Sequence, residues 1–347
     1  MGGNQEQVKE ILASYRIEPN FIESYGKVFK IYSMKGTFAL KRMKAKHGMD
    51  FIRHVQTLYQ MGFNRIVPIY PTVDGRYAVL KDQHLYYLMP WLPNDVKEDR
   101  TERFREMFRQ LARMHLISSK EITLKENERQ AHYEKMTETW KKEQEALQEM
   151  IERCESKTYM SPFELYFCMY YHEITLAYQY AIRKLEEWYE ETKEEKKTRV
   201  VITHGKVSPE HFLFDENGYG FFTNYERAKM TTPIHDLLPF IARLLKTYPK
   251  QHEECIDWIY TYWHHFPFKK DEFLLFQSYL AHPGHMYRLS QDYFNRPKKQ
   301  SELRSVAKLQ QSYWLLKNTE YVSIRMDEIE KSKVEQQKEA QTTSQSE

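Results

Sequence analysis

Hydrophobic and polar residues alternate along two stretches near the N-terminus, residues 21–32 and 37–41. A period of two is typical of β-strands that bury one face. The spacing then changes, because Phe51, Val55 and Leu58 recur at intervals of three and four residues, which places them on one face of a helix. The pattern predicts a sheet accompanied by one helix in this part of the chain.

Two further apolar runs, residues 66–70 and 77–80, flank an Asp-Gly dipeptide at residues 74–75. Asp-Gly between strand-like runs is a strong signal for a β-hairpin, so a hairpin is predicted here. A last apolar run, residues 86–89, leads into residues 90–93, where two prolines end the strand and begin a linker.

From about residue 98 onward the apolar residues have helical spacing. Phe104, Leu111 and Met114 share one face, and residues 119–197, which are rich in Glu and Lys, are predicted to contain two or three helices. Aromatic residues between 159 and 189 also recur at helical spacing. We interpret them as a core or interface face rather than as a cofactor site.

The end of the chain contains almost nothing apolar. Residues 326–347 are mostly Glu, Lys, Gln, Ser and Thr, which cannot offset the entropy lost on ordering, so a disordered tail is predicted. The predicted organisation is a small sheet-rich domain at residues 1–90, a helical domain at residues 91–325, and this charged tail.

Length and charge narrow the class of protein. At 347 residues the chain suits two compact units or one bilobal domain. Its 52 basic and 49 acidic residues give a formal net charge of +3 and are interleaved, so a nucleic-acid partner is not expected. No apolar run of about eighteen residues occurs, so no membrane span is expected. The N-terminus lacks the apolar region of a secretion signal.

Cysteine and aromatic contents add two expectations. The chain has three cysteines without metal-type spacing, Cys154, Cys168 and Cys255. They are typical of reduced thiols in a cytosolic protein, and no metal site is expected. With 26 Tyr, 19 Phe and 6 Trp, many tyrosines are expected near the surface, where they favour interfaces or cross-linking.

The most informative motif is HGKVSPEHFLF at residues 204–214. It resembles the catalytic loop of aminoglycoside and choline kinases, H-G-D-x-x-x-x-N, which a D-[FWY]-E strand follows about ten residues later. In those enzymes the first Asp orients and deprotonates the acceptor hydroxyl, while the Asn and the second Asp hold magnesium. Here the three positions are Lys206, His211 and Asn224. The spacing is kept, and no carboxylate stands at any of them.

Four other segments resemble the same superfamily. Residues 37–41 resemble the strand whose lysine, here Lys41, reaches the nucleotide phosphates, and residues 87–92, with Met89, resemble the hinge. The remaining two are the L-A-x-x-H helix end at 111–115 and the A-x-x-x-x-P-x-x-D-L segment at 228–237. The resemblance implies an α+β, bilobal protein-kinase-like fold with a small β-rich lobe and a large helical lobe.

Within that superfamily the chain resembles the CotS family of Bacillus-type spore coat proteins, and its YsxE-like members in particular. The resemblance rests on the patterns F-A-L-K, M-G-F-N-R-I-V-P, T-V-D-G-R-Y and Y-Y-L-M-P-W-L, joined to the altered loop. It implies synthesis in the mother-cell cytoplasm, deposition in the spore coat, and other coat proteins as partners.

The altered loop predicts a pseudokinase. The ammonium of Lys206 cannot accept a proton from an alcohol near neutral pH unless its pKa is strongly lowered. His211 and Asn224 offer neutral ligands where Mg²⁺ prefers carboxylate oxygens. No Glu occurs between Lys41 and Glu98, so the helix Glu that would pair with Lys41 is missing, and Asp50 is the nearest acid. The expected function is therefore structural, with no phosphotransfer and no cofactor.

Two alternatives stay open. In the first, Lys41 and Lys206 hold ATP or another anion without metal, and the protein is a nucleotide-binding regulator of coat assembly. In the second, displaced acids such as Asp215 or Asp236 support an active small-molecule phosphotransferase, although Asp215 lies in a predicted turn that would point it away from the cleft.

Other residues have predicted structural roles. His204 is expected to brace the loop through a backbone hydrogen bond. Glu226 and Asp236 are expected to hold helix termini or Arg partners, and residues 282–285, His-Pro-Gly-His, are expected to form a turn rather than a metal site.

Overall fold

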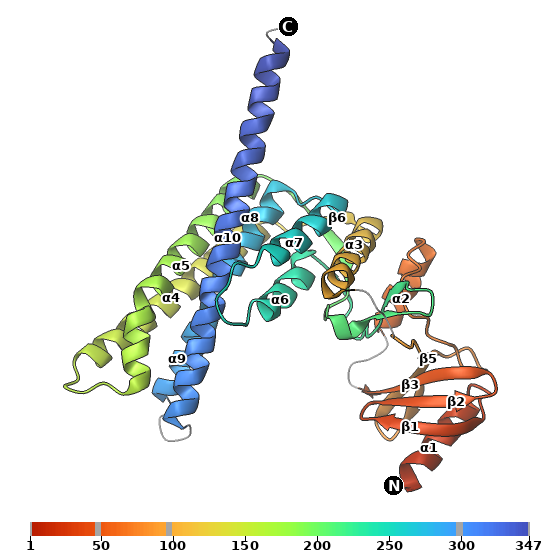
Figure 1. Cartoon of the computed structure of the whole chain (residues 1–347). Coiled ribbons are helices and arrows are strands. Elements are labelled where there is room, and N and C mark those ends of the chain that lie inside the picture. The colour runs from red at the N-terminus through yellow and green to blue at the C-terminus, as the bar shows by residue number, and fades with distance from the viewer. Residues whose placement is uncertain (1, 46–49, 95–98, 296–300, 346–347) are drawn as a thin grey trace. The chain divides into compact units, whose positions relative to one another are not determined.

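The computed structural model describes residues 2–45, 50–94, 99–295 and 301–345 (Figure 1). The chain divides into two compact units, one formed by residues 1–119 and 201–236 and the other by residues 120–200 and 237–347. The catalytic-loop segment thus belongs to the same unit as the N-terminal sheet, whereas the predicted boundary at residue 90 assigned it to the helical domain.

The first unit contains a five-stranded antiparallel sheet in the order β1-β2-β3-β5-β4. Its elements are α1 (Gly2–Ala13), β1 (Pro19–Tyr25), β2 (Val28–Ser33), β3 (Gly36–Lys44), α2 (Asp50–Gln60), β4 (Val79–Lys81), β5 (His84–Pro90) and α3 (Arg100–Ser118). The strands predicted at residues 21–32, 37–41 and 86–89 and the predicted helix are present. Helix α1 was not predicted, although Val8, Ile11 and Leu12 are buried in the same core as the sheet.

The predicted hairpin at residues 66–80 is wrong. A turn does form at Gly75, whose φ is +80° and whose N–H donates to the Thr72 carbonyl. However, β4 pairs with β5, and the earlier run pairs elsewhere: Ile66 forms a parallel bridge to Phe222. The backbone groups of residues 65–67 find partners in the strand that follows the catalytic loop, so they do not form a hairpin ladder.

The rest of the first unit carries the loop. Strand β7 (Lys197–Thr203) pairs in its second half with β10 (Lys229–Thr231). Between these strands lie the short helix η2 (Pro209–His211), β8 (Phe212–Phe214) and β9 (Gly220–Phe222). The turn predicted after β8 is present, because the Asp215 carboxylate accepts hydrogen bonds from the N–H groups of Asn217 and Tyr219.

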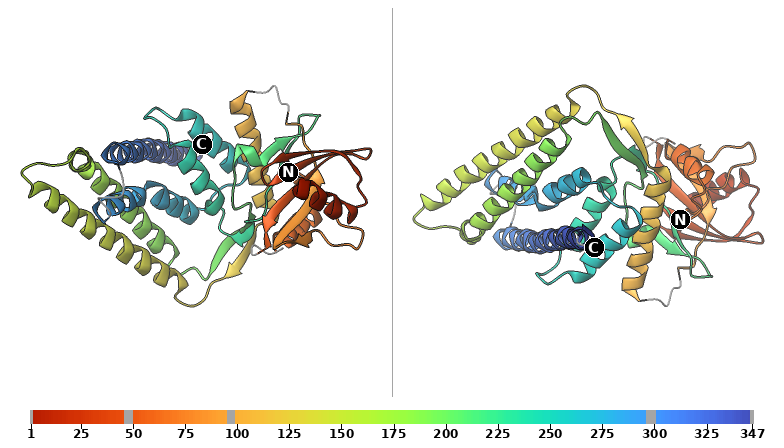
Figure 2. Two further views of the ribbon diagram at one scale, coloured as in Figure 1. Left: turned by 90° about the horizontal axis from the view of Figure 1, so that it is seen from below. Right: turned by 90° about the horizontal axis from the view of Figure 1, so that it is seen from above.

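The second unit is mainly helical, and Figure 2 shows its long helices from two sides. It contains β6 (Lys120–Thr123), which pairs with the first half of β7, together with α4 (Glu128–Glu155), α5 (Pro162–Thr192), most of α6 (Ile234–Leu244), α7 (Glu253–His265), α8 (Lys270–Ala281), α9 (Gly284–Asn295) and α10 (Glu302–Gln345). Helix α5 starts with a capping box between Ser161 and Glu164. None of the helices among the described residues combines the length and apolar character that a bilayer crossing requires.

Two sequence predictions concern these helices. The aromatic residues of α5 do form core, since Phe163, Phe167 and Tyr178 are fully buried. The expected disordered tail is instead the end of α10, which remains helical as far as Gln345. Met326 is fully buried, and the carboxylate of Glu330 accepts a hydrogen bond from the Tyr260 hydroxyl, so side-chain contacts order the helix beyond the predicted boundary.

Candidate functional site

Lys41 projects from β3 into a set of three partners supplied by β5 and the segment after β9. Its ammonium forms an ion pair with Glu226 and donates a hydrogen bond to the side-chain oxygen of Asn224. Tyr87, which lies opposite Lys41 in the β3–β5 register, donates its hydroxyl to Glu226 over 2.8 Å. The Lys41 and Glu226 side chains are only 12% and 17% exposed, so the pair is largely removed from water.

The sequence prediction for Glu226 was wrong. It was expected to hold a helix terminus or an Arg, but it forms the ion pair with Lys41. The chain turns sharply at Asn224, whose φ of +69° is a left-handed conformation that Asn tolerates better than most residues. Both Asn224 and Glu226 then reach the same ammonium.

The surroundings of this pair favour the charged form of Glu226. Burial opposes the charge on Glu226, but the adjacent Lys41 ammonium and the Tyr87 hydroxyl hold the pKa of this carboxyl below its usual range. Burial lowers the pKa of Lys41, and the carboxylate of Glu226 opposes that shift. Burial, reinforced by Glu226, raises the pKa of Tyr87 well above its usual range, so Tyr87 acts only as a hydrogen-bond donor here.

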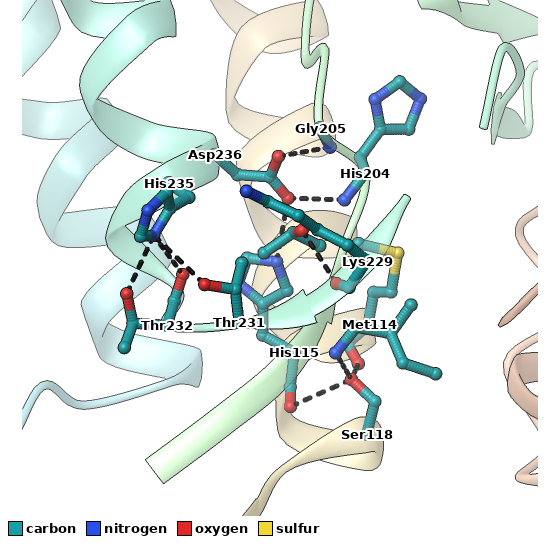
Figure 3. A network of polar contacts seen from close by, with 12 residues as sticks. Met114, His115, Ser118, His204, Gly205, Lys229, Thr231, Thr232, His235 and Asp236 are labelled. Carbon is teal, nitrogen blue, oxygen red and sulfur yellow. Dashed lines mark hydrogen bonds and ion pairs between the residues drawn. The ribbon is translucent and has the colours of Figure 1, made fainter. Parts of the chain in front are cut away.

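Asp236 organises the start of the catalytic loop (Figure 3). Its two carboxylate oxygens accept the backbone N–H groups of His204 and Gly205 over 2.6 and 2.7 Å, and the His115 ring donates to it over 3.1 Å. The side chain is fully buried. Burial opposes its charge, but these donors and the nearby His115 and His204 keep the pKa of Asp236 below its usual range. Asp236 thus binds backbone N–H groups of the loop, whereas it was predicted to hold a helix terminus or an Arg.

His204 braces the loop as predicted. Its Nε2–H donates to the Thr223 carbonyl over 2.7 Å, and its Nδ1 accepts the Lys206 N–H over 3.2 Å. Complete burial lowers the pKa of this ring, which keeps it neutral. Gly205 follows with a φ of +77°, and a Cβ at this position would overlap the backbone carbonyl of Arg227. The sharp bend therefore requires glycine.

The two altered positions in the loop contribute an exposed cation and a neutral ring. Lys206 is exposed, and its backbone carbonyl accepts a hydrogen bond from Nδ1 of His211 over 2.8 Å. Burial lowers the pKa of His211 to about 4, and the neighbouring lysines add to this effect. His211 is thus neutral at pH 7. No cluster of three or more His, Cys, Asp or Glu side chains within the described ranges is arranged to hold a metal ion.

The hinge segment retains few free backbone donors. Met89 is buried, and its sulfur accepts a hydrogen bond from the Thr223 hydroxyl over 3.6 Å. Of the next residues, Pro90 and Pro93 have no N–H group. The N–H groups of Trp91 and Asn94 donate to the backbone carbonyls of Thr37 and Phe214.

Comparisons with known proteins identify the family and the fold. The model of the phosphotransferase enzyme family matches residues 29–265. An aminoglycoside phosphotransferase from Alicyclobacillus acidocaldarius superposes with a TM-score of 0.65 at 15% identity, covering 92% of this chain and 96% of that one. A spectinomycin phosphotransferase bound to AMP gives 0.56 at 12% identity, covering 91% and 97%. A microcompartment-associated aminopropanol kinase gives 0.53 at 11%, covering 89% and 95%. No curated protein matches the sequence at a significant level. At these identities the structural likeness establishes the kinase-like fold.

Proposed function

The chain belongs to the phosphotransferase enzyme family, and we propose that it is a pseudokinase member that serves as a structural or assembly protein of the spore coat. The observation that carries this proposal is the engagement of Lys41 by Glu226 and Asn224. Glu226 and Asn224 take two of the three donors of the Lys41 ammonium, so a nucleotide phosphate would have to compete with both of them for this lysine.

The chemistry of the loop supports the same proposal. An ammonium, Lys206, stands where the family has its proton-accepting Asp, and loss of a general base costs about 10²–10⁴ in rate. Asn224 and His211 occupy the metal-binding positions with neutral groups. Asn224 already accepts a hydrogen bond from Lys41, and hard Mg²⁺ prefers carboxylate oxygens.

The hinge gives an independent argument against strong nucleotide binding. Adenine recognition at a strand edge relies on backbone donors and acceptors. In residues 90–94 two prolines provide no donor, and the N–H groups of Trp91 and Asn94 are used internally. Few backbone donors in this segment therefore remain available to recognise adenine.

The assignment to the spore coat rests on the CotS resemblance and is supported by the surface. Several tyrosines are at least half exposed: Tyr25, Tyr159, Tyr219 and Tyr248. Exposed aromatic side chains suit a protein that packs against other proteins or becomes cross-linked to them. We propose other coat proteins as its partners, the mother-cell cytoplasm as its site of synthesis and the spore coat as its destination.

A second candidate is a nucleotide-binding pseudokinase that regulates coat assembly. Its supporting observation is the exposed ammonium of Lys206, which lies close enough to Lys41 to lower its pKa. A phosphate could replace Glu226 as the partner of Lys41 without metal. An active phosphotransferase is less favoured, because the carboxylate of Asp215 is bound within its turn and that of Asp236 is buried with three donors.

Calorimetric titration with ATP, in excess Mg²⁺ and again in EDTA, separates these functions. The spectinomycin phosphotransferase serves as the positive control. We expect no binding heat from this chain in either buffer. Heat that persists in EDTA would favour the second candidate, and heat that requires Mg²⁺ would contradict the pseudokinase proposal.

The structural role is tested in sporulating cells. A fluorescent fusion of the protein should reach the forespore, and the Lys41→Ala and Lys206→Ala variants should reach it equally well. Failure of either correctly folded variant to be deposited would show that the cleft is needed, which a purely structural protein does not require.

A further inference from the structure

Helix α5 carries an apolar stripe that faces solvent, although the opposite side of the same helix is core. Leu165, Met169 and Leu176 are 52%, 63% and 46% exposed. Spacings of four and seven residues place them on one face of the helix. At 1.5 Å per residue the stripe extends for about 16 Å. Exposed apolar patches of this kind commonly mark interaction sites.

The C-terminal part of this stripe is hollowed. A cavity of about 280 Å³ lies between α5 and α10, which pack against each other, and its walls include Leu176, Ala177 and Tyr180 of α5 and Leu316 and Ile324 of α10. Ile324 is itself 48% exposed at this site. The N-terminal part of the stripe, by contrast, projects outward through Leu165 and Met169. One helix face thus carries both a protrusion and a hollow.

We propose that this face of α5 is the interface of a symmetric homodimer, with α5 packed antiparallel against α5 of a second copy. A two-fold axis between residues 172 and 173 places Leu165 opposite Tyr180 of the second copy and Met169 opposite Leu176, since the members of each pair lie equally far from the axis. The protrusion of each subunit then enters the hollow of the other, as an isologous interface requires.

The polar groups at the axis also match those of a second copy. The same register places the exposed His172 beside Glu173 of the second copy. The carboxylate of Glu173 is already fixed, because it accepts a hydrogen bond from Tyr313 and pairs with Lys317, each over 2.9 Å. The dimer thus brings a ring donor to a preoriented acceptor twice, once on each side of the axis.

Light scattering of the intact protein across a range of concentrations tests the dimer. Met169→Glu and Leu176→Glu place a charge in the apolar interface and should weaken the dimer by at least about tenfold. Met34→Glu is the matched control, because Met34 is 90% exposed in the other unit. A protein that is monomeric at every concentration, or a dimer that Met169→Glu leaves unchanged, would overturn the proposal.

The register has its own test, which holds even if a charged variant fails to fold. In a Cys168→Ser background, His172→Cys should form a disulfide-linked dimer on mild oxidation, because the two introduced thiols face each other across the axis. Gln179→Cys is the control on the same exposed face, where the two thiols would lie about 20 Å apart along the helices. Cross-linking at position 179 but not at 172 would exclude this pairing.

Discussion

Lys41 on β3 and Glu226, two residues beyond Asn224, form an ion pair that joins the N-terminal sheet to the segment after the catalytic loop. The pair stabilises the contact between these segments. Under the proposed function it also competes with a phosphate for the Lys41 ammonium.

Replacing Glu226 with Gln should destabilise the protein by about 2 kcal/mol, because the change leaves Lys41 largely buried without a counter-charge. Urea unfolding measures the loss. The Lys41→Met/Glu226→Gln double variant should recover part of it, since neither charge then remains.

Glu138→Gln provides the control for that experiment. Glu138 also pairs with a lysine, Lys142, but both side chains are about two-thirds exposed. Solvent screening should make this change far less costly than Glu226→Gln. Equal losses in Glu138→Gln and Glu226→Gln would show that burial adds nothing to the Lys41 pair.

His211 should make stability depend on pH. Its folded-state pKa of about 4 lies below the ordinary 6.5, so the unfolded chain binds the proton first as the pH falls. The folded protein is therefore unaffected above pH 6.5 and loses stability between pH 6.5 and 4, by about 2 kcal/mol at pH 5. Thermal unfolding at pH 7 and pH 5 should show a smaller loss for His211→Asn than for the wild type.

If His211→Asn and the wild type lose stability in parallel between pH 7 and 5, His211 is not responsible for the loss. The buried His204, whose pKa is also lowered, would then be the next ring to replace.

The family resemblance and the local patterns together predicted the fold, and the loop motif predicted the bracing role of His204. Alternation and helical spacing identified most strands and helices, and the H-G-K motif identified a loop that His204 braces. The partner of Lys41 could not be predicted in this way. It depends on the left-handed turn at Asn224, which directs two side chains toward a strand far away in sequence.

Two predictions were wrong for similar reasons: the hairpin at residues 66–80 and the disordered tail at residues 326–347. The run at residues 66–70 is strand-like, but its backbone groups pair with Phe222, and no local pattern encodes that choice. The C-terminal segment is polar in sequence, yet Met326 is buried and Glu330 accepts a hydrogen bond from Tyr260 of α7, and these contacts extend the order of α10. Long-range contacts therefore determine the structure of both segments.

Gly205 should tolerate no side chain. Gly205→Ala forces both a left-handed conformation and an overlap with the Arg227 carbonyl, so we expect a loss of roughly 3 kcal/mol. Gly26→Ala is the matched control, because Gly26 has a similar φ of +68° and open space around it, and its cost should be about 1 kcal/mol. Urea unfolding of both variants separates backbone strain from the overlap. Equal costs would mean that the loop moves away from Arg227 without difficulty.

Restoring the family's residues should restore ligand binding if the three altered positions are what abolished it. In the Lys206→Asp/His211→Asn/Asn224→Asp variant, Asp at 224 would place a second carboxylate near Glu226 and attract a divalent cation. Calorimetry should then detect ATP binding that requires Mg²⁺, in contrast to the wild type. The same variant with Lys41→Met should bind more weakly, because phosphate loses its cation. A restored variant that folds but still binds nothing would point to the hinge instead of the loop. There the N–H groups of Trp91 and Asn94 already donate to backbone carbonyls and are not available to a nucleotide.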